Sequence, residues 1–250
     1  MQNFTKYHEA ISYLEGLSNL PLQGDYIIDR TDPSKYLARM RYFLGLLGNP
    51  QKNFKYIHIT GTAGKGSTTN MIHEILRAAG KNTGCFTSPF VTSSIEKIKV
   101  KEKYISPDEL ADIVEHLKPY IDQAYAEGPY GRPSYFEIFL AIAFLYFKKK
   151  GCEWVVLEVG LGGRYDATNI IEKPLVTAIT NIDYDHMNVL GKTLRKIAYD
   201  KAGIIKRNSH FITGEQRPRL IRFFKQTCRD VGAHFNQIQH QETYSNYNEA

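Results

Sequence analysis

Apolar residues recur at intervals of three and four along two segments near the start of the chain, Tyr7 to Leu17 and Ser34 to Leu47. This spacing places them on one face of an α-helix, so we expect two amphipathic helices. The second segment runs into Gly48-Asn49-Pro50, and glycine followed closely by proline is typical of a helix stop. The chain therefore opens with a helical region that extends to about residue 50.

Beyond this region, short apolar runs alternate with helical patterns. Residues 55–60 have the length and composition of a buried strand, and a glycine-rich turn separates them from a helical pattern at residues 67–79. Further strands are expected at residues 82–87, 96–100, 154–159, 175–182 and 210–213, and further helices at residues 106–126, 134–150, 193–205 and 218–231. This alternation predicts an α/β fold, in which helices cover both faces of a mostly parallel sheet.

Two of the predicted helices begin with a capping box, in which a serine and a glutamate three residues later satisfy each other's backbone N–H groups. These are Ser106-Pro107-Asp108-Glu109 and Ser134-Tyr135-Phe136-Glu137. The second helix is apolar on all sides through residues 138–147, which predicts deep burial. Ten residues span only about 15 Å as a helix, half of a bilayer core, so we expect no membrane span.

The composition is that of an ordinary globular protein, with 42% hydrophobic, 12% aromatic and 23% charged residues, and it excludes disorder. Cys85, Cys152 and Cys228 lie far apart without a Cys-x-x-Cys pair, which argues against a disulfide framework or a structural zinc site. The net charge of +6 comes from lysines and arginines spread along the whole chain, which suits an anionic small molecule as well as a nucleic acid. No secretory signal is evident, so we expect a cytoplasmic protein.

The strongest chemical signal is Thr60-Gly61-Thr62-Ala63-Gly64-Lys65-Gly66-Ser67-Thr68, between a predicted strand and a predicted helix. Free backbone N–H groups and the helix dipole favour a phosphate there, and Lys65 would neutralise the β- and γ-phosphates. The common G-x-x-x-x-G-K-[ST] spacing is not met, because Ile59 replaces the first glycine and Gly66 separates Lys65 from the serine. The alternative is a flexible glycine turn with a solvated lysine. The predicted nucleotide-binding residues are Gly61, Thr62, Gly64, Lys65, Gly66, Ser67 and Thr68.

Four more motifs follow the glycine-rich loop in order. They are Phe86-Thr87-Ser88-Pro89, the run Glu-Val-Gly-Leu-Gly-Gly-Arg-Tyr-Asp-Ala-Thr-Asn at residues 158–169, Asp185-His186 with Leu190-Gly191, and Lys201-Ala202-Gly203-Ile204-Ile205. Together the five motifs resemble the folylpolyglutamate synthase/dihydrofolate synthase family of the Mur ligase superfamily, over residues 54–214. The resemblance implies a P-loop NTPase-like Mur ligase central domain, with residues 1–50 as a helical lead-in and residues 215–250 unplaced. Because such enzymes have two domains, we expect the C-terminal domain to be absent.

The resemblance implies an ATP-dependent amide ligase that joins L-glutamate to a carboxyl of dihydropteroate or of a folate, with Mg²⁺ as a cofactor. Transfer of the γ-phosphoryl group to the carboxylate would form an acyl phosphate, which the amine then attacks, so the enzyme mainly positions groups and neutralises charge. We expect a monomer without nucleic-acid or membrane partners. The alternatives are a stand-alone ATP-binding module, a fragment without ligase activity, and another Mur-type ligase.

The family pattern assigns Mg²⁺ to Ser88, Glu158 and His186, and Ser67 is the hydroxyl nearest to the metal position of a P-loop. A carboxylate after the apolar run 154–157 is costly unless it is paired or metal-bound, which favours a functional Glu158 over one that merely bonds a neighbour. His186 follows a strand end, where loops of α/β sheets build sites, although a structural histidine is the alternative. The implied catalytic residues are Lys65, His186 and Lys201.

Lys201 resembles the family lysine that is carbamylated by carbon dioxide, and its alternative is a solvated helical lysine. The resemblance also places the substrate, pterin side included, against Tyr135, Phe136, Glu137, Arg164 and Asp166. Aromatic rings can stack on a flat heterocycle, but Tyr135 and Phe136 can equally pack in the core while Glu137 only caps its helix. Departures from the family pattern are Ala63, Phe90, Ile95, Lys97 and the segment Asp29 to Arg39. The choice between dihydrofolate synthesis and polyglutamylation stays open.

Overall fold

A computed structural model describes residues 4–18, 32–128 and 131–239. Residues 29–31, which begin the segment that departs from the family pattern, lie outside the described residues. So do residues 240–250, the end of the unplaced region 215–250. The helices are α1 (Phe4–Ser18), α2 (Ser34–Leu46), α3 (Lys65–Ala78), α4 (Pro107–Glu127), α5 (Tyr135–Lys149), α6 (Met187–Leu190), α7 (Leu194–Lys201) and α8 (Pro218–Val231). The strands are β1 (Lys55–Thr60), β2 (Thr83–Phe86), β3 (Ile98–Val100), β4 (Lys103–Tyr104), β5 (Trp154–Glu158), β6 (Val176–Ile179), β7 (His210–Thr213) and β8 (His234–Gln237).

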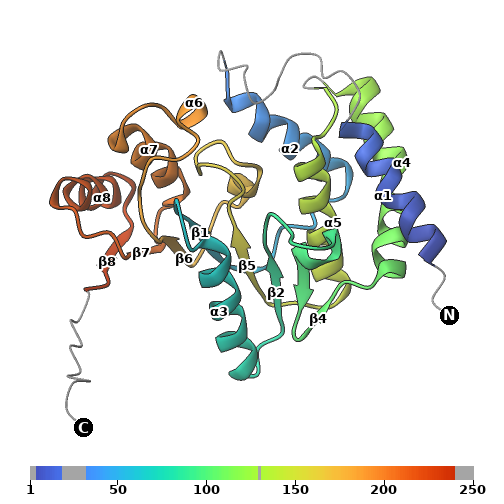
Figure 1. The fold of residues 1–250 in the computed structure, drawn as a ribbon, viewed down its shortest axis with the longest axis horizontal. Helices are drawn as coiled ribbons and strands as arrows, with labels where there is room; N and C mark the ends of the chain where they lie inside the picture. The colour runs from blue at the N-terminus through green and yellow to red at the C-terminus, as the bar shows by residue number, and fades with distance from the viewer. Residues whose placement is uncertain (1–3, 19–31, 129–130, 240–250) are drawn as a thin grey trace, which may run out of the picture.

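One sheet runs through the described part of the chain in the order β4-β3-β2-β5-β1-β6-β7-β8 (Figure 1). From β2 to β8 every neighbouring pair is parallel, and only β3 and β4 are antiparallel to their neighbours. The predicted mostly parallel α/β sheet is therefore confirmed. The carboxyl ends of parallel strands meet at one edge, so the loops after β1, β5, β6 and β7 lie together.

Helices cover both faces of the sheet, because successive strand residues point in opposite directions. Ile57, Ile59 and Val156 face α3, where they pack against Ile72 and Leu76. On the opposite face Tyr56, Phe86, Val155 and Leu157 join a larger core with side chains of α1, α2, α4 and α5. Residues 138–144 of α5 are all fully buried, as its all-round apolar pattern predicts. The sheet edge that bears the loops thus rests on a rigid base.

Several boundaries differ from the prediction for local reasons. Helix α3 begins at Lys65, two residues earlier than expected, because Gly64 already completes the turn with a φ of 76°. Strand β3 begins only at Ile98, because residues 94–97 form a 3₁₀ helix with a capping box of Ser93 and Glu96. The short elements α6 and β4 were not predicted, and neither was β8, which pairs with β7 in the unplaced region.

Both predicted capping boxes are present, at the first turns of α4 and α5. Cys85, Cys152 and Cys228 are buried and free, as expected. Among the described helices, none has both the length and the apolar character that crossing a bilayer requires.

Candidate functional site

The glycine-rich loop turns sharply between β1 and α3. Gly61 has a φ of 155°, and a Cβ atom at this position would lie 1.8 Å from Thr180 Oγ1, so only glycine fits. Gly64 adopts the left-handed conformation directly before the helix and offers no side-chain cap to it. The first backbone N–H groups of an α-helix have no partner within the helix. The amino end of α3 is therefore built to receive an anion.

Two lysines converge on this loop from different helices. Lys65 Nζ, from the start of α3, donates to the carbonyl oxygen of Gly61 at 3.1 Å, and Lys201 Nζ, from the end of α7, donates to the same oxygen at 2.9 Å. Lys201 is 1% exposed, so the alternative of a solvated helical lysine is wrong. Burial, with a further contribution from the charge of Lys65, lowers the pKa of Lys201 to about 8, although Asp185 Oδ2 lies 3.9 Å from its ammonium group. The loop thus holds two ammonium groups at one carbonyl oxygen.

A buried carboxylate stands on the other side of the loop. Glu158 ends β5 and is 3% exposed, and its Oε2 accepts a hydrogen bond of 2.9 Å from the backbone N–H of Ser88. A Cβ atom at Gly66 would lie 3.3 Å from Oε2, which places the carboxylate directly against the first turn of α3. Burial raises the pKa of Glu158, while the Ser88 N–H and the charge of Lys65 act in the opposite direction. The fold thus brings Glu158 and Ser88 together beside Gly66.

His186 lies apart from this pair. It is exposed, has a φ of 42°, and its Nε2 lies 3.4 Å from Asp185 Oδ1, on the side of Lys201. No contact among the described residues joins it to Glu158, and in the same part of the chain no group of three or more His, Cys, Asp and Glu side chains could hold a metal ion. The side chains near the loop that could hold a metal ion are therefore few, namely the Glu158 carboxylate with the Ser88 hydroxyl and the Ser67 hydroxyl in the first turn of α3. Such a donor set fits Mg²⁺, which is held by one or two carboxylates together with phosphate and water.

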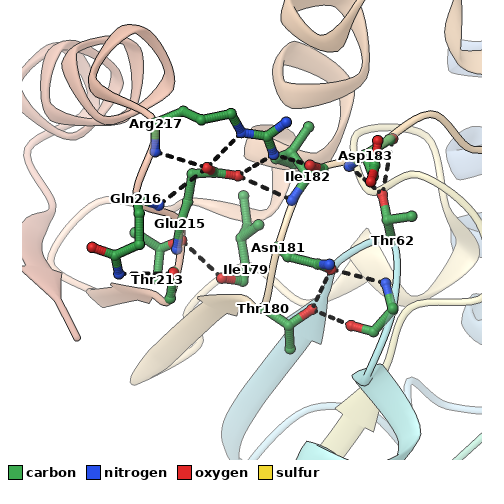
Figure 2. A network of polar contacts seen from close by, with 12 residues as sticks. Thr62, Ile179, Thr180, Asn181, Ile182, Asp183, Thr213, Glu215, Gln216 and Arg217 are labelled. Atoms are coloured by element: carbon green, nitrogen blue, oxygen red, sulfur yellow. Dashed lines mark hydrogen bonds and ion pairs between the residues drawn. The ribbon is translucent and has the colours of Figure 1, made fainter. Parts of the chain in front are cut away.

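The segment after β6 holds the loop in place, and the sequence analysis missed it. Asn181 Oδ1 accepts from the backbone N–H of Ala63 at 2.9 Å, and Thr180 Oγ1 donates to the Ala63 carbonyl at 2.6 Å. Thr62 Oγ1 donates to the carbonyl of Asp183 and accepts from its backbone N–H at 2.9 Å. Figure 2 shows these side chains between the two strand ends. The sequence does carry a signal, since residues 180–183 lie at the end of the strand predicted at residues 175–182, at the edge where sites form.

A cavity of about 540 Å³ opens next to Ser88 and Asp166. Its other lining residues come mainly from α2, the start of α5, and the loop after β5, and they include Tyr36, Arg39, Lys97, Ser134, Phe136, Glu137, Gly160, Tyr165 and Asp200. Tyr135 is not among them: its ring packs on Phe139, with centroids 4.7 Å apart. The predicted trio therefore divides, with Phe136 and Glu137 on the cavity wall and Tyr135 half-buried against the core outside it.

The cavity wall contains two cations. Arg39 Nε donates to Glu137 Oε2 at 2.8 Å, and the same oxygen accepts from the Ser134 N–H, so Glu137 both caps α5 and pairs with α2. Lys97 is 5% exposed, and its ammonium lies 4.5 Å and 4.2 Å from the ring centroids of Tyr135 and Phe139. Burial lowers the pKa of Lys97 to about 8. The sequence analysis gave neither cation a role.

Asp166 lines the cavity and is held by its own loop. Its carboxylate accepts from the N–H groups of Leu161 and Thr168, both at 2.9 Å, and from Thr168 Oγ1 at 2.5 Å. His58 Nε2 lies 2.8 Å from Thr168 Oγ1; because that hydroxyl donates to Asp166, it accepts from the histidine. Burial lowers the pKa of His58 to about 3 and raises that of Asp166. A neutral histidine in the core therefore orients the cavity carboxylate.

Arg164 has a different position from the one expected of a substrate contact. Its Nη2 donates to the carbonyl of Tyr199 at 3.1 Å, and its guanidinium lies 4.1 Å from the centroid of the Tyr199 ring. It is not among the residues that line the cavity. In this arrangement Arg164 joins the loop after β5 to α7.

Comparisons with known proteins agree with this geometry. Residues 59–233 match the family model described as the Mur ligase middle domain. The dihydrofolate synthase/folylpolyglutamate synthase of Bacillus subtilis is 37% identical over 236 residues, covering 94% of this chain and 52% of the relative. The chain thus spans about half the length of the curated relatives it matches.

Solved structures show the same relationship. The Mycobacterium tuberculosis folylpolyglutamate synthase complexed with ADP and AMPPCP superposes with a TM-score of 0.80 at 31% identity, over 92% of this chain and 50% of that one. A folylpolyglutamate synthase complex with AMPPCP and folate gives a TM-score of 0.79 at 32% identity, over 92% and 53%. The family model matches well over half of the chain, from the end of β1 to just beyond the end of α8. The chain therefore belongs to the Mur ligase middle-domain family.

Proposed function

We propose that this chain supplies the ATP-binding part of an amide ligase that joins L-glutamate to the carboxyl of dihydropteroate or of a folate. The observation that supports this most strongly is the convergence of Lys65 and Lys201 on Gly61, at an uncapped helix end with the Glu158 carboxylate beside it. The relatives named above have this activity in their names, and the solved ones bind AMPPCP.

The triphosphate would lie against the amino end of α3. Backbone N–H groups of residues 65–67 would donate to its oxygens, with the hydroxyls of Thr62, Ser67 and Thr68 in reach of the same loop, and Lys65 would exchange its bond to Gly61 for the β- and γ-phosphates. The γ-phosphoryl group then passes to the acceptor carboxylate: the new P–O bond forms as the bond to the β-phosphate oxygen breaks, and ADP leaves. The neutral amine of glutamate then attacks the acyl carbon; the C–N bond forms, the nitrogen gives up a proton to solvent, and inorganic phosphate leaves with the electron pair of its C–O bond.

Glu158, Ser88 and Ser67 would hold Mg²⁺, which when bound neutralises charge on the phosphates. The protein's part is to keep these oxygens in place. The Ser88 N–H fixes one carboxylate oxygen of Glu158, and the buried strand β5 fixes the rest of the side chain. His186, which the resemblance assigns to the metal, lies on the Lys201 side of the loop, and its role as a metal ligand stays a prediction.

The acceptor would occupy the cavity beside Ser88. The Phe136 ring on the cavity wall could stack on a flat heterocycle, and the Asp166 carboxylate suits the N–H donors of a pterin. Tyr135 would act only through packing, and Arg164 by holding the loop of Asp166 against α7. The carboxyl end of the acceptor would then point along Ser88 toward the phosphate loop.

Carbamylation of Lys201 fits its surroundings. A neutral amine is needed to attack carbon dioxide; the N–C bond forms, one C=O electron pair moves to oxygen, and a proton leaves. Burial of Lys201 favours the neutral amine, since it lowers the pKa to about 8. Intact-protein mass measured in the presence and absence of bicarbonate tests this, and an unmodified Lys201 in both would remove the carbamate from the proposal.

The decisive experiment mixes the purified protein with Mg-ATP, L-glutamate and either dihydropteroate or tetrahydrofolate, and measures ADP and the glutamylated product. Product that requires all components supports the ligase, and the preferred acceptor separates the two activities. Nucleotide binding without product supports a stand-alone ATP-binding module or a partial enzyme. No nucleotide binding at all contradicts the proposed function. A product from a cell-wall precursor instead would indicate another Mur-type ligase.

A further inference from the structure

Beyond the phosphate loop, an ion pair between the buried Glu215 and the half-exposed Arg217 holds the backbone where β6 leaves the sheet. Glu215 is 5% exposed, and its Oε2 accepts from the backbone N–H of Ile182 at 3.2 Å. Arg217 Nη2 donates to the carbonyl oxygen of Ile182 and, at 2.6 Å, to Glu215 Oε2. Arg217 Nε adds a bond of 2.7 Å to Glu215 Oε1. Both polar groups of one peptide residue are thus held by one side-chain pair (Figure 2).

Glu215 and Arg217 hold the backbone beyond the point where β6 and β7 stop pairing. The last bonds from the end of β7 to β6 run from Gly214 N–H, at 3.4 Å, and from Thr213 Oγ1, at 2.8 Å, and both reach the carbonyl of Ile179. Three residues later, Ile182 has no strand partner in β7, and among the described residues its backbone N–H and carbonyl form hydrogen bonds only with the side chains of Glu215 and Arg217. The path of the chain after β6 therefore depends on them.

The clamped segment is the one that supports the phosphate loop. Thr62 N–H donates to the carbonyl of Asn181 at 3.0 Å, the Asn181 side chain takes the N–H of Ala63, and Asp183 exchanges two bonds with Thr62 Oγ1. Ile182 lies in the middle of these contacts. A shift of its backbone would move Asn181 and Asp183, and with them the turn that contains Thr62 and Ala63.

We propose that Glu215 and Arg217 are positioning residues for the phosphate loop, acting through Ile182. They touch neither the loop nor any group assigned to the reaction, and they lie in the region where no motif was found. The competing explanation is a purely local one: Glu215 also accepts from the N–H groups of Gln216 and Arg217, so it orders the turn directly before α8. The two explanations differ in which amides respond when Arg217 is changed.

The test compares Arg217→Met with Arg219→Met, which removes the same charge from an exposed position in the same helical turn. Hydrogen exchange is measured amide by amide on the whole protein without nucleotide. We expect the amides of Thr62, Ala63 and Asp183 to exchange about tenfold faster in Arg217→Met and unchanged in Arg219→Met. Arg217→Lys, which keeps the charge but not the forked donors, should lie between. Faster exchange confined to α8 and β8, or no change, would overturn the proposal.

A second readout concerns ATP and rests on the proposed function. The Mg-ATP affinity should fall about fivefold to tenfold in Arg217→Met, partly recover in Arg217→Lys, and stay at the wild-type value in Arg219→Met. If the wild-type protein binds no ATP, the proposed function fails while the exchange data still decide on the positioning role. If ATP binds equally to all variants while exchange is unchanged, the positioning role fails alone. Should Arg217→Met not fold, Glu215→Gln, which keeps the side-chain shape, takes its place in both measurements.

Discussion

The amino ends of α3 and α5 both lie against the end of β5, yet they are built in opposite ways. Gly66 in α3 lies next to Glu158, and a Cβ atom at Gly160 would lie 2.8 Å from the ring of Phe136 in α5. Helix α5 is closed by its own capping box, whereas α3 starts from a left-handed glycine without any side-chain cap. Closing a helix end stabilises the fold, and leaving one open reserves its N–H groups for a ligand.

The uncapped amino end of α3 should be decisive for Mg-ATP binding and contribute little to the free energy of unfolding. We expect Lys65→Ala to weaken Mg-ATP binding about 1000-fold, which corresponds to about 4 kcal/mol, because it removes the ammonium that compensates the phosphate charge. Isothermal titration calorimetry measures the affinity, and urea denaturation should show an unfolding free energy within about 0.5 kcal/mol of wild type. Lys81→Ala, an exposed lysine beyond the other end of α3, is the control. Equal ATP affinity in both variants would contradict the phosphate assignment.

The capped amino end of α5 should instead contribute strongly to the free energy of unfolding. Glu137→Ala removes the capping box of α5 and the partner of Arg39 in a buried pair, so we expect a loss of about 3 kcal/mol in unfolding free energy. Glu109→Ala removes the same box from α4, where the glutamate is more exposed and pairs with Lys150, and should cost only about 1 kcal/mol. Both are read from urea denaturation midpoints. Equal losses would mean that the pair with Arg39 contributes nothing beyond the cap.

The same two helix ends show what the sequence can predict. The capping box of α5 is a local pattern, as is the glycine-rich turn before α3, and both were found because residues three or four apart determine them. The division of Tyr135 from Phe136 was not predictable, since periodicity alone does not say which of two neighbouring aromatic rings faces a cavity on a helix buried on all sides.

Contacts between distant segments set the rest of the site. From the residues alone Lys201 could be a solvated helical lysine, whereas in the fold its Nζ donates to the carbonyl of Gly61, 140 residues away. The partners of the phosphate loop, Asn181 and Thr180, form bonds that span more than 110 residues. No spacing rule connects such positions, and the resemblance to a family pointed to Lys201 but not to Thr180 or Asn181.

Lys97 lies beside the first turn of α5, the capped helix end. Replacing it should raise the free energy of unfolding, whereas replacing Lys65 should weaken ATP binding. No ion pair joins Lys97 to an acidic side chain within residues 4–18, 32–128 and 131–239, and burial lowers its pKa to about 8 from 10.5. We therefore expect Lys97→Met to raise the unfolding free energy by about 2 kcal/mol at pH 7, after loss of the cation–π contacts is allowed for. Exposed Lys103→Met is the control and should change it by less than about 0.5 kcal/mol.

The pH dependence gives this prediction its sign. Between pH 8 and 10.5 the unfolded chain binds a proton at Lys97 that the folded chain has lost, so the wild type gains stability as the pH rises. The advantage of Lys97→Met should therefore be complete below pH 8, shrink through this interval and vanish above it. Urea denaturation at pH 7.0 and at about pH 9.5 measures the change. A constant advantage at both values would show that Lys97 stays charged in its aromatic surroundings.

The smallest expected effect concerns Gly64, the N-cap residue of α3, which has no side chain to cap the helix. Gly64→Ala meets no atom within 4 Å, so its cost comes only from the φ of 76°, and we expect a loss of about 1 kcal/mol in unfolding free energy. Gly45→Ala in α2 is the matched control: it also meets no atom, but its φ is helical, and it should gain about 0.5 to 1 kcal/mol. The difference between the two variants isolates the left-handed conformation from the helix propensity of alanine. If Gly64→Ala also stabilised the protein, the turn before α3 would relax without its left-handed residue, and the contrast with the rigid cap of α5 would lose its basis.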